Sequence, residues 1–141
     1  LMSGLLTVEE DNKITETLWR KLAINCAINP LTAIYQCKNG ELCRNPEYYA
    51  EMEKICTEVE KVIDALGLPL FNQPLIEQAA KVAELTGNNS SSMMLDAQHQ
   101  RKTEIDSITG FLCKTAQKLG VKTPTNHKYW QLIKDGHPPL S

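Results

Sequence analysis

At 141 residues the chain is long enough for one compact domain with a sizeable hydrophobic core. Apolar residues make up 42% and charged residues 23% of the sequence, which is ordinary for a globular protein, and the formal net charge is -2. This charge balance argues against a dedicated nucleic-acid binder. No apolar run approaches the roughly 20 residues that span a bilayer, and the first residues lack the basic leader of a signal peptide. We therefore expect a cytoplasmic protein.

The first eight residues have the pattern expected at the end of an upstream domain. Ser3 and Gly4 resemble the C-terminal cap of a helix whose body is missing, and an extended piece follows over residues 5–8. We expect residues 1–8 to be the remnant of an upstream domain with its linker. Residues 9–141 are then expected to form one helical domain that binds substrate and contributes to catalysis.

Proline and glycine residues divide the remaining sequence into helices. The first helix is predicted to run from residue 9 to about Asn29, where Pro30 must end or kink it because proline has no backbone N–H. A short helix over residues 31–37 is predicted to stop at Asn39 and Gly40. The apolar periodicity predicts further helical segments over residues 46–66, 74–85, 93–95 and 105–119, and a last helix after residues 123–126 that includes residues 129–133. Strand patterns are nearly absent, so the predicted fold class is all-α.

A polar stripe interrupts the most apolar stretch of the chain. Lys21, Asn25 and Asn29 are four residues apart, and each step of four turns a helical side chain by about 40°. A cation and two amides beside residues such as Leu22 need partners, because burying unpaired polar groups costs several kcal/mol. A ligand with a carboxylate, carbonyl or hydroxyl group could supply them. The alternative is a solvated helix face, with Asn29 capping the turn before Pro30.

A second group of polar residues lies later in the chain. Ser92 is placed to cap a helix, and Glu104 lies at a predicted helix start, where the helix dipole alone favours an acidic residue. Gly110 falls inside a predicted helix, which indicates that another group approaches the backbone closely there. Each feature has a purely structural explanation, but their co-occurrence favours a functional site.

The cysteines and histidines do not indicate a metal site. The five cysteines lack a CxxC pair and companion histidines at ligand spacing, so free thiols in a reducing compartment are expected. A disulfide between Cys37 and Cys43 is the less favoured alternative. His99, His127 and His137 are expected at the surface.

With these motifs in hand, the chain resembles the C-terminal domain of ketopantoate reductase (2-dehydropantoate 2-reductase), in order and over nearly its whole length. The matching segments are LWRKL (18–22) with Asn25, NPLTA (29–33), NGEL (39–42), SSM (91–93), TEID (103–106) and PTN (124–126). The resemblance implies a single helical domain like those of 6-phosphogluconate dehydrogenase-like folds. It also implies a dinucleotide-binding domain immediately upstream.

Members of that family reduce ketopantoate to pantoate with NADPH, on the way to pantothenate and coenzyme A. The resemblance implies that Lys21 is the catalytic lysine, which binds substrate and protonates the carbonyl oxygen as hydride reaches the carbon. By the same resemblance, Asn25, Asn29 and Asn39 contact substrate. Ser92 matches a serine that binds the carboxylate end of the substrate.

Glu104 matches a glutamate on the cofactor side of the cleft, where it could hydrogen-bond the ribose or orient Lys21. NADP(H) itself is expected to be bound mainly by the absent N-terminal Rossmann domain. The other implied partners are a small 2-oxo acid substrate and, optionally, a second copy in a homodimer; no nucleic acid or membrane is expected.

Two alternatives stay open at this point. Residues 98–100 and Thr109 depart from the family pattern, so the substrate could be another 2-oxo acid. The chain could also be a non-catalytic helical interaction or dimerisation module, with its polar stripe facing solvent or a partner.

Overall fold

The computed structural model describes residues 8–69 and 72–136, with side chains from residue 13 onward. Every regular element in those ranges is a helix, which confirms the all-α prediction. The predicted extended piece and the upstream remnant fall on residues 1–7, outside the described ranges, and Val8 is already helical. The elements in chain order are α1 (Val8–Tyr35), α2 (Glu41–Arg44), α3 (Pro46–Ala65), α4 (Leu75–Leu85), α5 (Ser92–Gln98), the π-helical turn η2 (Asp106–Gly110), α6 (Phe111–Leu119) and α7 (Pro124–Lys134).

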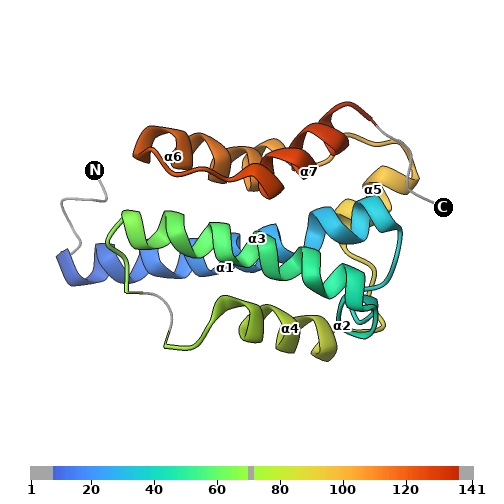
Figure 1. The fold of residues 1–141 in the computed structure, drawn as a ribbon, viewed down its shortest axis with the longest axis horizontal. Helices are drawn as coiled ribbons and strands as arrows, with labels where there is room; N and C mark the ends of the chain where they lie inside the picture. The colour runs from blue at the N-terminus through green and yellow to red at the C-terminus, as the bar shows by residue number, and fades with distance from the viewer. Residues whose placement is uncertain (1–7, 70–71, 137–141) are drawn as a thin grey trace.

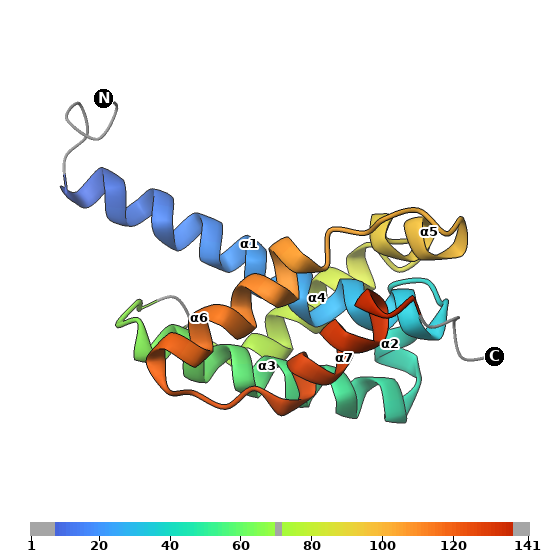
Figure 2. The same cartoon turned by 90° about the horizontal axis from the view of Figure 1, so that it is seen from above.

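The helices form three layers. Figure 1 shows α1 and α3 side by side in the middle, α6 and α7 above them, and α4 below. The core fills the space around α1 and α3, where Leu31, Met52 and Val59 are fully buried. The N-terminal part of α1 projects beyond the other helices (Figure 2). No helix of the described ranges is long and apolar enough to cross a membrane.

Of the two predicted effects of Pro30, ending the first helix was wrong. α1 continues to Tyr35 with Pro30 inside it. The ring removes one backbone donor, but the hydroxyl of Thr32 lies 3.2 Å from the carbonyl oxygen of Ile28 and 3.0 Å from that of Asn29. Pro30 itself is buried, and packing on this part of α1 offsets the lost hydrogen bond.

Two glutamates of α3 hold the N-termini of the helices on either side of it. The buried Glu58 accepts hydrogen bonds from the backbone N–H groups of Thr125 and Asn126, both at 2.9 Å, at the start of α7. Glu60 accepts from the backbone N–H of Leu75, the first residue of α4, at 3.0 Å. Helix N-termini have unpaired N–H groups and a positive dipole end, so a carboxylate stabilises them. These contacts fix α4 and α7 against α3.

Gly110 is approached closely, as its position in a helix predicted. A Cβ atom at this position would lie 2.9 Å from the indole of Trp130, so only glycine fits without a shift. The neighbouring group is therefore a side chain of α7 rather than a ligand. The indole N–H of Trp130 also donates to Asp106 at 2.8 Å, which ties α7 to η2.

Candidate active site

The predicted stripe lies along one face of α1. Lys21 is exposed, and Asn25 and Asn29 are half-buried. None of the three side chains forms a hydrogen bond or ion pair with any residue in the described ranges. The face therefore presents one ammonium and two amide groups, over about 12 Å of helix, that have no partner in that part of the chain.

Apolar residues continue the same face toward the N-terminus of α1. Ile14 lies four residues before Leu18, and Leu18 lies three residues before Lys21, so all three lie on one side of the helix. Ile14 is 48% exposed and Leu18 is 63% exposed. Beside them, Phe111 is 49% exposed and packs against Trp19 with a ring-centroid distance of 5.6 Å. Large apolar side chains gathered on one surface commonly mark an interaction site.

The start of α5 packs on α1 close to Asn29. Ser91, not Ser92, caps α5: its Oγ accepts from the backbone N–H of Met94 at 3.0 Å, so the predicted cap is shifted by one residue. The Oγ of Ser91 also lies 2.7 Å from Oγ1 of Thr32, one helical turn after Asn29. Ser92 follows as the first residue of α5 and is exposed.

Glu104 is exposed and lies directly before η2, which packs on α1. Its neighbour Ile105 is buried in the core and fixes the backbone at this point. The carboxylate of Glu104 has no hydrogen bond or ion pair to the residues that the structure describes, and it forms no ion pair with Lys21. It is thus available to a group from outside these residues.

Asn39 lies beyond the end of α1 that is far from Lys21. About 21 Å of helix separates Lys21 from Tyr35, and Asn39 comes after that end of α1. Asn39 is 8% exposed, and its amide donates to Oγ1 of Thr86 at 3.0 Å. Its backbone N–H donates to the carbonyl of Asn89 at 3.1 Å. These bonds tie the turn before α2 to the turn after α4, and the buried Oδ1 has no partner among the described residues.

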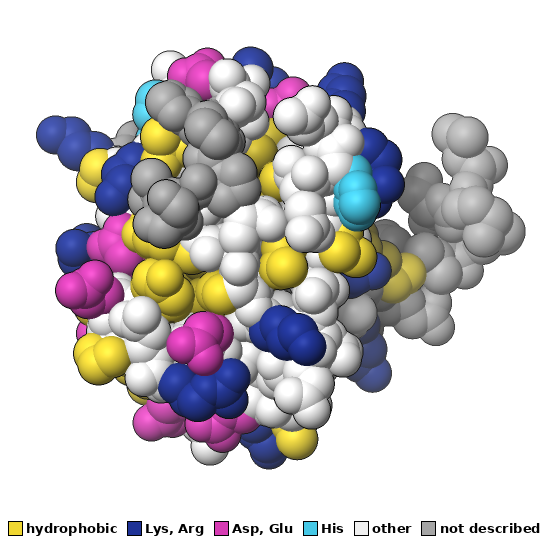
Figure 3. Space-filling view, turned by 90° about the vertical axis from the view of Figure 1, so that its right-hand side faces the viewer, with side chains coloured by type: hydrophobic (Ala, Val, Ile, Leu, Met, Phe, Trp, Pro, Cys, Tyr) yellow, Lys and Arg dark blue, Asp and Glu magenta, His cyan; other side chains and the backbone are white. Residues whose placement is uncertain are grey.

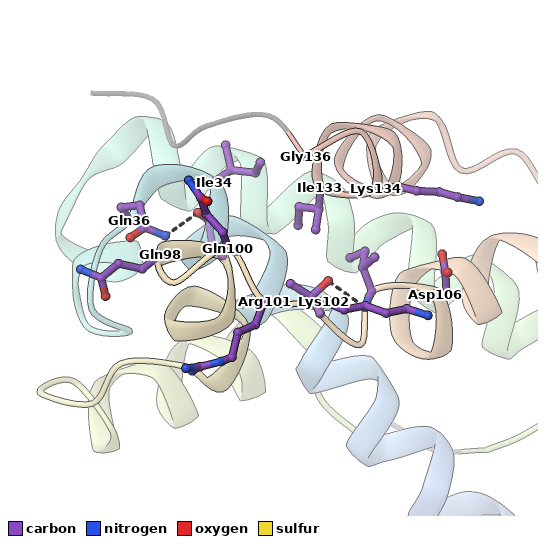
Figure 4. Close-up of a pocket in the computed structure, with 14 residues that line it drawn as sticks. Ile34, Gln36, Gln98, Gln100, Arg101, Lys102, Asp106, Ile133, Lys134 and Gly136 are labelled. Carbon is purple, nitrogen blue, oxygen red and sulfur yellow. Dashed lines mark hydrogen bonds between the residues drawn. The ribbon is translucent and has the colours of Figure 1, made fainter.

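A cavity of about 580 Å³ lies at the C-terminal end of α1, and sequence reasoning did not find it. Its walls come from the end of α1, from residues 97–106 and from the end of α7, and none of the six predicted site residues lines it (Figure 4). Ile34, Ile105 and Ile133 form its apolar part. The one sequence signal was the polar run over residues 98–102.

Two of the three cations at this cavity have contacts of their own. Arg101 pairs with Asp96 at 3.0 Å. Lys134 lies 5.3 Å from the centre of the Trp130 ring, and Figure 4 shows the side chain of Lys102 extending toward Asp106. A hydrogen bond from Trp130 holds the pKa of Asp106 below its usual value. Figure 3 shows this end of the molecule, with hydrophobic side chains across its middle and charged side chains both below them and at its margins.

All five cysteines are free thiols, as expected. Burial raises the pKa of the Cys37 thiol to about 11 and of the Cys56 thiol to about 12. Burial likewise raises the pKa of Cys26, Cys43 and Cys113. Thiols with raised pKa values make poor nucleophiles at neutral pH.

Residues 13–137 match the protein family described as "Ketopantoate reductase PanE/ApbA C terminal". A 2-dehydropantoate 2-reductase from Yersinia pestis is 40% identical over 134 residues, which cover 95% of this chain and 43% of that protein. The chain thus spans less than half the length of this curated relative.

Solved structures agree with the sequence match. The crystal structure of a PanE/ApbA family ketopantoate reductase from Ralstonia eutropha superposes with a TM-score of 0.78 at 31% identity, covering 85% of this chain and 40% of that one. A ternary structure of D-mandelate dehydrogenase with NADH and anilino(oxo)acetate superposes with a TM-score of 0.79 at 26% identity, covering 87% of this chain and 52% of that one.

Proposed function

The chain belongs to the ketopantoate reductase PanE/ApbA C-terminal family. On that premise we propose that it is the helical, substrate-binding domain of an NADPH-dependent reductase that converts 2-dehydropantoate to pantoate. The observation that carries the proposal is the face of α1 on which Lys21, Asn25 and Asn29 have no partner among the described residues. A 2-oxo acid has a ketone and a carboxylate, which are acceptors for those donors.

In this proposal Lys21 is the catalytic residue. Its ammonium donates a proton to the ketone oxygen while hydride reaches the carbonyl carbon, so the product is a neutral alcohol and the lysine is reprotonated from solvent. Asn25 and Asn29 donate hydrogen bonds that orient the substrate, and the exposed hydroxyl of Ser92 binds its carboxylate. Asn39 stays a predicted substrate contact, although its amide already bonds Thr86.

NADP(H), when bound, supplies the hydride, and we propose that it is held mainly outside this chain. The described residues offer no glycine-rich turn that would cradle a pyrophosphate. The exposed carboxylate of Glu104, which has no partner among the described residues, fits a hydrogen bond to a ribose hydroxyl, or it orients Lys21 once the site is closed.

We further propose that an upstream dinucleotide-binding domain covers the apolar end of the α1 face. Ile14 and Leu18 lie in line with Lys21, so a domain that docks on them also closes over the lysine. A homodimer stays a prediction, which sedimentation of the complete protein tests.

Replacing Lys21 tests the proposal in the complete protein. Lys21→Ala should lower kcat for 2-dehydropantoate by at least about 100-fold, the lower range for a lost general acid. The circular dichroism spectrum should be unchanged, because Lys21 is exposed. Lys61→Ala, an exposed lysine of α3, is the matched control. Turnover of Lys21→Ala within a few-fold of wild type would refute the role of Lys21.

A different 2-oxo acid is the second candidate substrate, and the likeness to the D-mandelate dehydrogenase structure favours it. Comparing kcat/KM for 2-dehydropantoate with values for smaller and for aromatic 2-oxo acids decides between them. An absence of turnover with all of these acids, in the presence of NADPH or NADH, would instead support the interaction module.

A further inference from the structure

Two hydroxyl groups, those of Thr32 and Ser91, join α1 to the N-terminal cap of α5. Thr32 is fully buried and Ser91 is 8% exposed, and their oxygens are 2.7 Å apart. Neither residue was among the predicted site residues. Both are adjacent to residues that were: Asn29 is one turn before Thr32, and Ser92 follows Ser91.

The direction of the hydrogen bonds follows from counting protons. Each hydroxyl has one proton to donate. The Oγ of Ser91 already accepts from the N–H of Met94, and Oγ1 of Thr32 lies within hydrogen-bond distance of two carbonyl oxygens, those of Ile28 and Asn29. Both protons are used when Ser91 donates to Thr32 and Thr32 donates to the carbonyls. The reverse direction would leave the proton of Ser91 without an acceptor among the described residues.

This chain of bonds connects the cap of α5 to the backbone of α1 beside Pro30. A second tie lies one turn further on, where the Gln36 amide donates to the carbonyl of Met94 at 3.2 Å and to that of Ala33 at 2.9 Å. The helix start that carries Ser92 is therefore held in a fixed position relative to Asn29. The N–H that Pro30 lacks would have bonded the carbonyl of Cys26. The Thr32 hydroxyl contacts the carbonyls of Ile28 and Asn29 instead, so it adds hydrogen bonds to the turn of α1 that includes Pro30.

We propose that Thr32 and Ser91 are a positioning pair that sets the distance between the Asn29 amide and the Ser92 hydroxyl for 2-oxo acid binding. The proposal rests on the proposed function, since it concerns the same site. The pair does not touch substrate. It acts through the backbone, so its loss should weaken substrate binding more than it slows the chemical step at Lys21.

Thr32→Val removes the hydroxyl and keeps the branched shape. In the complete protein we expect the KM for 2-dehydropantoate to rise about 3- to 10-fold, the usual value of one hydrogen bond. The kcat should change less than twofold and the KM for NADPH should be unchanged. Thr32→Ser restores the hydroxyl and should restore the KM. Thr57→Val is the matched control, because Thr57 also donates to a carbonyl of its own helix, that of Glu53 at 3.0 Å, but is exposed.

A double-mutant cycle tests whether the two hydroxyls act together. If they do, Thr32→Val combined with Ser91→Ala should raise the KM no more than the larger single effect. Independent, multiplying effects would overturn the proposal, as would a wild-type KM in folded Thr32→Val. If Thr32→Val does not fold, Ser91→Ala is compared with Thr32→Ser. An increased KM in Ser91→Ala but not in Thr32→Ser supports the pair, and an unchanged KM in Ser91→Ala overturns the proposal.

Hydrogen exchange separates this proposal from the proposed function. Amides of α5 should exchange faster in Thr32→Val than in Thr57→Val, whichever substrate the protein uses. Absent turnover in the wild type would refute the proposed function. Unchanged exchange in α5 would show that the hydroxyl pair does not hold this helix, and the inference alone would fail.

Discussion

The strongest stability prediction concerns Glu58, whose carboxylate holds α7. Its two oxygens accept three hydrogen bonds at 2.9 Å: one from the backbone of Thr125, and two from the backbone and side-chain amide of Asn126. In Glu58→Gln the single carbonyl oxygen can keep both bonds to Asn126. The new NH2 group then faces the N–H of Thr125, donor against donor. One bond to a charged group, worth about 1.5–3 kcal/mol, is lost.

The charge at the helix N-terminus adds about 0.3–1 kcal/mol, so Glu58→Gln should cost about 2–4 kcal/mol of unfolding free energy. Urea unfolding followed by circular dichroism at 222 nm measures this as a midpoint shift of about 1 M or more, with the slope unchanged. Glu53→Gln, an exposed residue of the same helix, should stay within about 0.5 kcal/mol of wild type. A loss below that value in Glu58→Gln would refute the capping argument.

Three further outcomes are expected. Burial opposes ionisation of Glu51, but three hydrogen bonds outweigh it and lower the pKa of Glu51 from 4.5 to about 2. The ionised carboxylate therefore stabilises the fold fully above pH 4.5, and this stabilisation is lost as the pH falls toward 2. Glu51→Gln should therefore reduce the pH dependence of the free energy of unfolding across that range. An unchanged dependence on pH would contradict this. Gly110→Ala should lower the free energy of unfolding by about 1–3 kcal/mol because the new Cβ meets Trp130. Adding Trp130→Leu to this variant should recover part of the loss, as measured in thermal melts. Burial and the nearby Glu41 raise the pKa of Cys37 to about 11. Iodoacetamide should therefore label Cys37 far more slowly at pH 8 than it labels the amino acid cysteine in solution.

Helix boundaries were predictable where they depend on neighbouring residues. Asn45 caps α3 through bonds to the next N–H groups, and Gly120 takes the left-handed conformation that ends α6. Pro30 shows the limit of such rules. Its effect on α1 depends on burial and on the Thr32 hydroxyl, and the partner of that hydroxyl, Ser91, lies 59 residues away.

The placement of the candidate polar residues on one helix face was predictable from the sequence, but the long-range contacts that hold the surrounding helices were not. The four-residue spacing alone places Lys21, Asn25 and Asn29 on one face. No local pattern connects Glu58 to Asn126, 68 residues later, although that bond fixes α7. The PTN segment, noted as a family element, contains Asn126, which is buried and bonded to Glu58. Its observed contacts are structural.

The face of α1 changes character along its length, and that change bears on how the site is completed. Its first part presents exposed Ile14 and Leu18, and its middle presents Lys21 and Asn25, which have no partner among the described residues. Exposed apolar side chains gain free energy when another surface covers them, whereas unpaired polar groups gain only from a ligand or water. A domain that docks on the apolar part therefore leaves a polar space beside Lys21. In the proposed function, docking energy and substrate recognition are thus separated along one helix, and closure would strengthen the hydrogen bonds to the substrate by excluding water.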